Sequence, residues 1–440
     1  MGDKTGVITG NNKGSILISH GRVIDPGNNR DEVLTIHVED GIIKSISKER
    51  PEEGSFDTEI DTEGKWVTPG LIDMHVHLRE PGQEEKETIR TGTKAASAGG
   101  FTAVACMPNT SPVLDEESKI RYVLQRGEDS TCRVYPVGSM TKNLEGVELS
   151  PYGEMVRAGA KAFSDDGKSV ARNDVMKNAF NYSKSFDIPL LCHSELEDLS
   201  SGGHMNEGNL STELGLKGIP SISEEICVAR DIMLAEYTGA RVHICHVSTR
   251  GAIDLIRAAK ERGVNVTSET CPHYFSFTDQ DCREYNTAMK MKPPLRRPED
   301  RDAVVEGIRS GVIDVIASDH APHAKEDKDT EFETAAFGVI GLETMVPAVI
   351  TKLLKPGVIS PADFVRMLSI NPASILREEG GDISEGKRAD ITVIDPEAVR
   401  VIDPEKFYSK GRYSPFNGME LTGFAVATIK DGGLVYCCGS

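Results

Sequence analysis

The chain has 440 residues, of which 38% are hydrophobic and 27% are charged, so it is long enough for a large core and more than one domain. The formal net charge of -19 at pH 7 argues against a nucleic-acid or anionic-membrane partner, because both require a basic surface. A small anionic substrate is still compatible with this charge, because one local arginine can override the global field.

The cysteines and the apolar runs indicate the compartment. The nine cysteines are scattered, odd in number and form no CxxC motif, and several lie in apolar runs where cysteine acts as a small hydrophobe. We therefore expect reduced thiols in a cytoplasmic protein. No apolar run approaches the length of a membrane span, so no membrane partner is expected.

Both ends of the chain predict β-structure. Roughly the first 65 residues contain GSILISHGRVIDP and EVLTIHVEDGIIKSIS, which alternate apolar and polar residues between Asp-Pro and Asp-Gly turn signals. Roughly the last 60 residues repeat this pattern in ADITVIDP and FAVATIKDGGLVYC. Two β-rich flanks therefore enclose a middle region of a different kind.

The middle region alternates short apolar runs with amphipathic stretches, which predicts strands connected by helices. The predicted strands are 67–77, 101–109, 132–140, 159–167, 188–195, 240–248, 264–274 and 312–322. Right-handed crossovers between them imply a parallel sheet, and eight units in about 310 residues predict a (β/α)8 barrel. A doubly wound open sheet is the alternative, but no GxGxxG or GxxxxGK[ST] motif follows a strand. The long polar loops 196–221 and 323–339 are expected to cover the active face.

Most of the predicted strands end on a side chain that can bind a metal ion or form hydrogen bonds. These residues are His75 and His77, Asn109, Asp165 and Asp166, His193, His246, His273 and Asp319. Catalytic groups of a (β/α)8 barrel lie at these carboxyl ends. Imidazoles two positions apart point to the same face of a strand, so the pair in HVH suits a zinc-like ion. Asp319 can both bind metal and exchange a proton with a nucleophilic water.

Several of these residues also have ordinary structural explanations. His20, His37, His204 and His243 are interpreted as core histidines bonded to backbone carbonyls, and His273 is equally compatible with a supporting role at the site. The adjacent Asp165 and Asp166, followed by Gly167, are compatible with turn chemistry. Asp319 is compatible with a helix N-cap.

The motifs GLIDMHVHLREPG, FTAVACMPNT, FSDDG, LCHSE, HICHVST, ETCPHYF, KPPLR, SDHAPH, FGVIGLET and INPASIL resemble those of the dihydroorotases, cyclic-amide hydrolases of the amidohydrolase superfamily. The match runs in order from about residue 14 to the end of the chain. It implies a (β/α)8 barrel at 68–378 with a small β-sandwich formed from 1–67 and 379–440. It also implies one or two zinc ions per chain, with two expected.

The resemblance implies the ligands of these ions. They are His75, His77, Asp166, His193, His246 and Asp319, with Asp319 also acting as general acid and base. In many relatives a carboxylated lysine in a G-F-K pattern bridges the metals, but here Ser164 follows Phe163. The chain therefore resembles the branch in which an aspartate replaces that lysine. Asp166 stands 27 positions before His193, as in that branch, which selects it over Asp165.

The resemblance also implies the residues that bind the substrate. They are Arg79 as the carboxylate clamp, Asn109, His323, Lys292, Ala336, Phe337 and Gly338. Lys292 stands where the family has asparagine, and Ala336 stands where it has proline, so the contribution of both positions is an open question. A planar guanidinium can pair with a carboxylate through two parallel hydrogen bonds, which favours dihydroorotate over substrates that lack a carboxylate.

The predicted reaction is the reversible cyclisation of N-carbamoyl-L-aspartate to (S)-dihydroorotate and water, in the de novo biosynthesis of the pyrimidine nucleotide UMP. One alternative is another cyclic-amide hydrolase, such as an allantoinase, hydantoinase or dihydropyrimidinase. A second is a non-catalytic dihydroorotase-like partner of aspartate transcarbamoylase, although such chains have lost ligands that are present here. A homodimer is expected, and a complex with aspartate transcarbamoylase is compatible with the resemblance.

Overall fold

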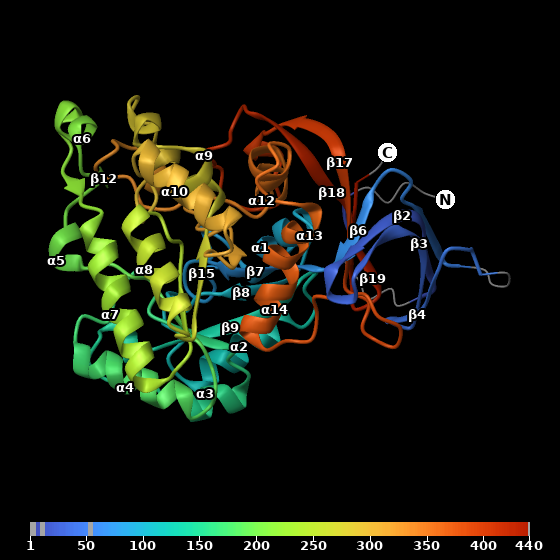
Figure 1. Cartoon of the computed structure of the whole chain (residues 1–440), viewed down its shortest axis with the longest axis horizontal. Helices are drawn as coiled ribbons and strands as arrows, with labels where there is room; N and C mark the ends of the chain where they lie inside the picture. The colour runs from blue at the N-terminus through green and yellow to red at the C-terminus, as the bar shows by residue number, and fades with distance from the viewer. Residues whose placement is uncertain (1–5, 9–13, 52–55, 439–440) are drawn as a thin grey trace.

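The computed structural model describes residues 6–8, 14–51 and 56–438 (Figure 1). A helix-covered barrel forms the larger part, and a β-rich part on the right of the view contains strands from both ends of the chain. This arrangement confirms the predicted fold class. No helix within the described ranges is long and apolar enough to cross a membrane.

Eight parallel strands of the described chain form the barrel, in the order β16-β15-β14-β11-β10-β9-β8-β7. Their bounds are β7 (Leu71–Val76), β8 (Phe101–Cys106), β9 (Arg133–Ser139), β10 (Ala162–Ser164), β11 (Leu190–Cys192), β14 (Val242–Ile244), β15 (Val266–Thr270) and β16 (Val315–Ile316). The two edges meet through a parallel bridge between Val76 and His320. The His77 N–H donates to the His320 carbonyl over 2.8 Å, so the sheet is nearly closed.

Helices cover the outside of the barrel between the strands (Figure 1). They are α1 (Ile89–Ala98), α2 (Glu117–Gly127), α3 (Tyr152–Ala158), α4 (Asn173–Lys184), α7 (Ile222–Thr238), α8 (Arg250–Glu261), α10 (Pro298–Arg309), α12 (Met345–Val349), α13 (Pro361–Val365) and α14 (Asn371–Leu376). The sequence of α8 shows why these segments are helical. Thr249 caps its first turn by accepting from the Ala252 N–H, and Ile253, Ile256 and Ala259 are buried at helical spacing.

The β-rich part is a sheet of nine strands within the described residues. Its order is β1 (Gly6–Val7), β19 (Gly433–Cys437), β18 (Glu420–Lys430), β17 (Ile391–Val401), β6 (Trp66–Pro69), β2 (Ile16–Asp25), β3 (Arg30–Glu39) and β4 (Ile42–Ser47), with β5 (Thr58–Asp61) paired to β2. Ile36, Val67, Val393 and Ile429 lie in its buried apolar core. The domain limits at 67/68 and 378/379 stay a prediction.

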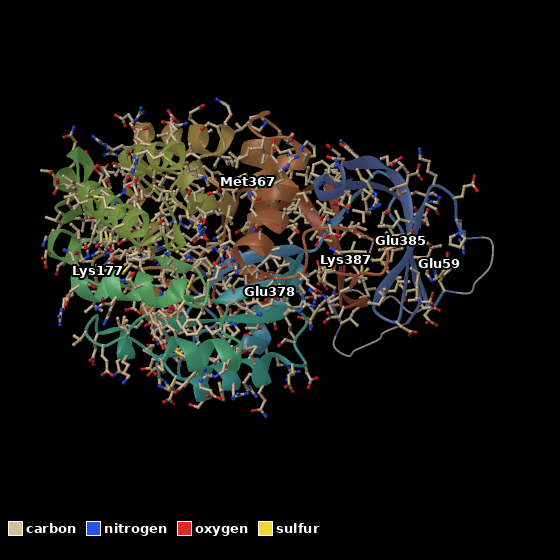
Figure 2. The ribbon with its side chains drawn as sticks, turned by 60° about the horizontal axis from the view of Figure 1, so that its bottom comes forward. Glu59, Lys177, Met367, Glu378, Glu385 and Lys387 are labelled. Carbon is tan, nitrogen blue, oxygen red and sulfur yellow. The ribbon has the colours of Figure 1, made fainter. Side chains whose placement is uncertain are left out.

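The amino ends of barrel strands face this β-rich part. Figure 2 shows Glu378 and Lys387 in the region where the two parts meet. Arg133, the first residue of β9, donates to Asp390 over 3.0 Å and also to Asp431. Arg388 donates to the same Asp390 over 2.8 Å. The junction is therefore a network of half-buried ion pairs.

One predicted strand, 67–77, is two strands in the structure. The run breaks at Gly70, where β6 leaves the β-rich sheet and β7 enters the barrel. A Cβ atom at Gly70 would lie 2.2 Å from the Thr102 side-chain oxygen, so the crossing requires glycine. The sequence run is apolar throughout because both strands are buried, which conceals the break.

The other predicted strands exist but are shorter than expected. The prediction for 264–274 is wrong beyond Thr270, because α9 (Pro272–Ser276) begins there. Pro272 occupies a first-turn position where a missing N–H costs nothing. The loop 196–221 contains α5 (Glu197–Ser200), α6 (Asn209–Leu214) and the paired strands β12 (Met205–Asn206) and β13 (Gly218–Ile219). The loop 323–339 contains α11 (Lys325–Lys328).

Candidate active site

The six predicted metal ligands lie together at the carboxyl ends of the barrel strands. They come from five strand ends: His75 and His77 from β7, Asp166 from β10, His193 from β11, His246 from β14 and Asp319 from β16. All six are buried. Residues far apart in the sequence meet here because parallel strands bring their carboxyl ends to one face of the barrel.

The Asp166 carboxylate lies at the centre of this cluster. Its Oδ1 lies 3.4 Å from His75 Nε2, 3.5 Å from His246 Nε2 and 3.6 Å from His193 Nδ1. Its Oδ2 lies 3.3 Å from His77 Nε2. Asp166 therefore belongs to two groups of potential ligands, one with His75 and His77 and the other with His193 and His246.

Acceptor oxygens hold the outer nitrogens of three of these histidines. Glu269 Oε1 lies 2.5 Å from His75 Nδ1, and Asn109 Oδ1 lies 2.8 Å from His77 Nδ1. An acceptor can bond only to a ring N–H, so these contacts favour the tautomers whose bare nitrogens face Asp166. Glu195 Oε2 lies 3.0 Å from the outer nitrogen of His193 in the same way.

This donor set fits a metal ion. Two lone-pair groups facing each other at these distances repel unless a cation lies between them. His75 Nε2 and Asp166 Oδ1 are buried and have no hydrogen-bond partner among the described residues. Buried polar atoms are normally satisfied, so these two atoms are available for coordination. Imidazole nitrogens with carboxylate oxygens are ligands that zinc accepts.

Asp319 lies beside His75 and His77, at a point where the backbone has an unusual conformation. Its backbone has a φ of +45°, which lies in the left-handed region that non-glycine residues rarely adopt. Its Oδ1 lies 3.2 Å from His77 Nε2 and 3.6 Å from His75 Nε2. Burial raises the pKa of Asp319, but the neighbouring histidines outweigh this effect and hold it below its ordinary value. The carboxylate is therefore in its charged, proton-accepting form.

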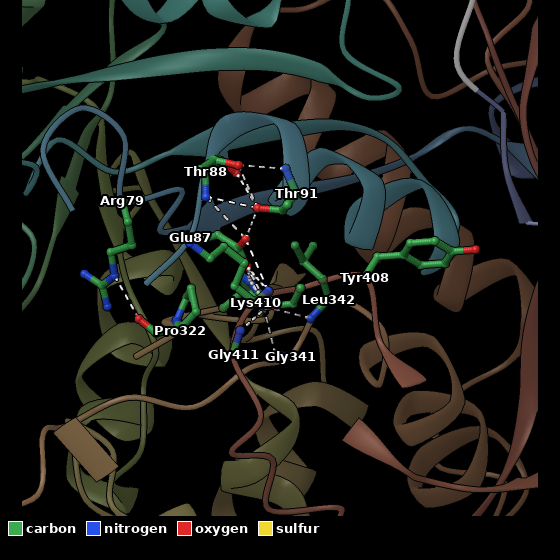
Figure 3. A network of polar contacts seen from close by, with 12 residues as sticks. Arg79, Glu87, Thr88, Thr91, Pro322, Gly341, Leu342, Tyr408, Lys410 and Gly411 are labelled. Carbon is green, nitrogen blue, oxygen red and sulfur yellow. Dashed lines mark hydrogen bonds and ion pairs between the residues drawn. The ribbon is translucent and has the colours of Figure 1, made fainter. Parts of the chain in front are cut away.

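The neighbouring His320 anchors Asp319 from behind. The His320 ring lies 3.4 Å from Glu87 through Nε2, and its Nδ1 accepts from the Gly341 N–H over 3.2 Å. Glu87 also accepts from the Ser409 hydroxyl over 2.5 Å and from the Lys410 N–H. Figure 3 shows these contacts around Glu87. The segment after β17 thereby helps to fix the position of the predicted general acid and base.

Arg79 presents a buried guanidinium to the same region. Its Nε donates to the Pro322 carbonyl over 3.1 Å, as Figure 3 shows, while its two terminal nitrogens have no hydrogen bond within the described residues. Burial lowers the pKa of Arg79 to about 10, which leaves it charged at neutral pH. The two terminal N–H groups can pair with an incoming carboxylate.

Three other predicted substrate residues have partners within the protein. Asn109 holds His77 and donates to the Asp166 carbonyl over 3.3 Å. The His323 Nε2–H donates to the Phe337 carbonyl over 2.7 Å. Burial, together with Arg79, lowers the pKa of His323 to about 3, so the ring is neutral and its Nδ1 is an acceptor. Lys292 pairs with Glu195 over 3.0 Å, so it supports the carboxylate that holds His193.

Two fully buried lysines hold the backbone around Ala336, Phe337 and Gly338. The Lys328 ammonium donates to the carbonyls of Ala336 and Gly338, each over 2.9 Å, and to that of Lys290 over 3.2 Å. The Lys290 ammonium donates to the Phe332 carbonyl over 2.6 Å and lies 4.6 Å from the centre of the Phe337 ring. Neither lysine has a carboxylate partner within the described residues.

The sequence interpretation missed Glu269, Glu195, Lys290 and Lys328. A charged residue inside an apolar strand was a usable signal for Glu269, which lies in VTSET and is completely buried. The prediction that four histidines bond to backbone carbonyls is wrong, although His243 is a buried core residue as expected. His243 contacts the side chains of Thr267 and Glu269, and His20 pairs with Asp61 on the surface. His37 contacts the Ser15 hydroxyl and His204 faces Glu333.

His273 is buried beside the site, and its Nε2 has no partner among the described residues. Burial lowers its pKa to about 4, so the ring is neutral.

Known proteins resemble this chain along nearly its whole length. A family model described as Dihydro-orotase-like matches residues 64–252, and one described as Amidohydrolase family matches residues 243–436. The dihydroorotase of Acetivibrio thermocellus is 49% identical over 421 residues, covering 96% of this chain and 98% of that protein. That of Syntrophotalea carbinolica is 48% identical over 423 residues, covering 96% and 99%. The solved L-hydantoinase (dihydropyrimidinase) of Arthrobacter aurescens superposes with a TM-score of 0.87 at 25% identity, covering 97% and 96%.

The barrel, its β-rich companion and the buried histidine–aspartate cluster, whose donors fit a metal ion, define a hydrolase of the amidohydrolase class. Within that class the chain belongs to the dihydroorotase family and acts on a cyclic amide. The other cyclic-amide hydrolases are not favoured, because the hydantoinase likeness is at 25% identity and the dihydroorotases are at 48–49%.

Proposed function

We infer that the six buried ligands hold zinc, two ions per chain, and that they serve the interconversion of N-carbamoyl-L-aspartate and (S)-dihydroorotate. The observation that carries this inference is the position of Asp166, whose two oxygens face different histidines. One carboxylate between two groups of nitrogens can bridge two cations and reduce their mutual repulsion. When bound, zinc would supply a water of lowered pKa and would polarise the amide carbonyl.

The side chains of this protein account for the remaining steps. In the hydrolytic direction Asp319 accepts the proton of the attacking water and returns it to the ring nitrogen as the C–N bond breaks. Arg79 pairs with the substrate carboxylate and fixes the ring relative to Asp319. The neutral His323 accepts a hydrogen bond from a substrate N–H through Nδ1. In the synthetic direction the same proton transfers run in reverse.

Metal analysis of the purified protein, run beside a carbamoyl-aspartate cyclisation assay, tests this inference. We expect close to two zinc ions per chain and turnover that a chelator abolishes and zinc restores. Absence of bound zinc, with no turnover after zinc addition, would refute it. Comparing dihydroorotate with allantoin and dihydrouracil tests the substrate, and faster turnover of either uncharged compound would contradict the role of Arg79.

The chain is also proposed to form a homodimer in the cytoplasm and to be able to associate with aspartate transcarbamoylase. All nine cysteines are unpaired thiols, which supports a reducing compartment. Size exclusion with and without aspartate transcarbamoylase tests the association, and an unchanged elution volume together with unchanged activity would count against it.

A further inference from the structure

Helix α7 exposes large apolar side chains on its outer face. Ile222 is 49% exposed, Ile226 44%, Met233 68% and Tyr237 78%. The inner face buries Cys227, Val228, Ile232 and Ala235 against the barrel, together with the polar Ser223, Glu224, Asp231 and Thr238. A helix on the outside of a barrel ordinarily turns polar residues to water, whereas α7 turns a row of large apolar side chains to water. Figure 1 shows α7 at the edge of the barrel farthest from the β-rich part.

The four exposed residues form one narrow stripe. At 3.6 residues per turn their directions fall within an arc of about 60° around the helix axis. Ala229, the residue near the middle of the stripe, points in nearly the same direction and is small. A continuous exposed apolar stripe of this kind marks a protein–protein contact more often than scattered surface residues do.

The spacing of the four residues along the helix is symmetric about a midpoint. Its residues are four, seven and four positions apart, so the midpoint lies between Ala229 and Arg230. A two-fold axis perpendicular to the helix at this midpoint places Ile222 opposite Tyr237 of a second copy and Ile226 opposite Met233. A contact between two copies of one chain requires this kind of self-complementary surface. Ala229 at the crossing point lets the two helices approach closely.

The charges at the two ends of α7 support the same antiparallel arrangement. The exposed Glu197 and Asp198 of α5 lie near its start, where the Leu196 N–H donates to the Ser223 carbonyl. The exposed Lys184 lies at its other end, where its Nζ donates to the Thr238 carbonyl over 2.8 Å. An antiparallel pair brings the acidic end of one copy to the basic end of the other.

Other exposed apolar side chains lie on, or just after, the helices that contact α7. Leu199 of α5 is 40% exposed, and Phe186, which follows α4, is 37% exposed. A stable pair needs roughly 800 Å² of surface from each copy, which is more than four side chains supply. Phe186 rests against Tyr182 and Gly153, so Leu199 is the residue that adds apolar area near the start of α7.

We propose that α7 is the self-association surface of this protein, with two copies packing their α7 helices antiparallel about the Ala229–Arg230 midpoint. This deepens the homodimer inferred above by naming the surface and its geometry. The stripe lies on the outside of the barrel, so the pairing does not depend on the catalytic assignments.

Sedimentation velocity of the full chain tests the surface. The wild-type protein is expected to sediment as two copies, and Met233→Glu is expected to raise the dissociation constant at least about 30-fold, because it places a charge in the apolar stripe. Val33→Glu is the matched control, because Val33 is 59% exposed and lies on β3 of the β-rich part, and this variant is expected to stay paired. A wild-type protein that sediments as one copy, or a Met233→Glu variant that stays paired, would overturn the proposal.

Cysteine cross-linking tests the antiparallel direction. Mixing an Ile226→Cys chain with a Met233→Cys chain under oxidation is expected to give a disulfide between residues 226 and 233, identified by mass spectrometry of the linked peptides. A product that joins 226 to 226 and 233 to 233 with no 226–233 link would refute the geometry. Zinc content and cyclisation by Met233→Glu are measured on the same samples, and both are expected to stay near wild type. A wild-type protein that contains no zinc would count against the proposed metal centre and would leave the α7 proposal unaffected.

Discussion

The amino ends of the barrel strands pair half-buried charges with opposite charges, whereas the carboxyl ends leave several buried charges without an ion-pair partner among the described residues. At the amino ends Arg133 contacts both Asp390 and Asp431. At the carboxyl ends the terminal nitrogens of Arg79 have no hydrogen bond within the described residues, and Lys328 meets only carbonyl oxygens. The two ends are built from the same strands, so the difference lies in the side chains that each end carries.

The free-energy cost of burying a charge explains the difference between the two ends. A buried charge without a partner is expensive, and a protein that retains one usually binds a ligand that supplies the missing charge. Burial lowers the pKa of Arg133, but Asp390 and Asp431 outweigh this effect and raise it above its ordinary value. Burial lowers the pKa of Arg79 to about 10. The paired arginine therefore serves stability, and the one without a counter-ion is available for substrate.

The largest effect expected at the carboxyl ends is that of Asp166→Asn. An amide cannot bridge two cations as a carboxylate does, so zinc per chain should fall and kcat should drop by more than about 10³-fold. Asp165→Asn is the matched control, because Asp165 accepts from the Thr141 N–H over 3.0 Å instead of facing the histidines. Zinc counts and initial rates measure both variants. Full zinc occupancy in Asp166→Asn would show that Asp166 is not needed as a metal ligand and is an ordinary turn residue.

The next effect is at the amino ends and concerns stability. Arg133→Met leaves Asp390 and Asp431 without their partner, so the free energy of unfolding should fall by about 3 kcal/mol. The KM for carbamoyl-aspartate should stay within about twofold of wild type, because Arg133 is remote from the substrate. Urea unfolding and steady-state kinetics give the two values. A large rise in KM would contradict the assignment of stability to the amino ends and of substrate binding to the carboxyl ends.

Arg79→Ala is expected to give the converse result. Losing a charge-assisted bidentate contact should raise the KM for carbamoyl-aspartate about 100-fold, with zinc content unchanged. Stability should fall little or rise, since the variant removes a buried charge that has no counter-ion. Kinetics and thermal unfolding on one preparation report both quantities. If KM does not change, the clamp assignment fails.

The smallest effect is expected from Lys328→Met, which removes three hydrogen bonds to the backbone near Ala336 and Gly338. KM should rise about tenfold and kcat should change little, because the backbone is displaced while the metal ligands are not. A KM that stays at the wild-type value would show that the loop does not need Lys328.

The same variant carries a pH signature. Burial lowers the pKa of Lys328 to about 7 from 10.5, so the unfolded chain binds this proton more tightly than the folded chain. The folded state is therefore penalised below pH 7, and the penalty fades as pH rises toward 10.5. The free energy of unfolding of wild type relative to Lys328→Met should rise over that interval. A constant difference in urea melts would contradict the shift.

Much of the fold and of the metal cluster could be predicted from the sequence. Parallel strands place their polar last residues on one face, so the order of strand ends was enough to bring His75, His193 and Asp319 together. The break at Gly70 could not be predicted, because two consecutive buried strands have the same apolar pattern as one long strand.

The supporting residues were less predictable because their partners are distant in sequence. Glu269 reaches His75 across 194 positions, and Lys328 contacts the Lys290 carbonyl across 38. A buried lysine that donates only to backbone carbonyls leaves no sequence motif, because every residue has a backbone carbonyl. The sequence does not predict what Lys292 contacts, and the structure shows an ion pair with Glu195.

The central position of Asp166 has a consequence for how the protein matures. A carboxylated lysine bridge forms only after carbon dioxide reacts with the amine of the chain, so a centre that uses one depends on dissolved bicarbonate as well as on metal. An aspartate is complete when the ribosome releases the chain. With Asp166 bridging the ions as proposed above, assembly of the centre would depend on folding and on metal supply, and would be independent of the carbon dioxide level of the cell.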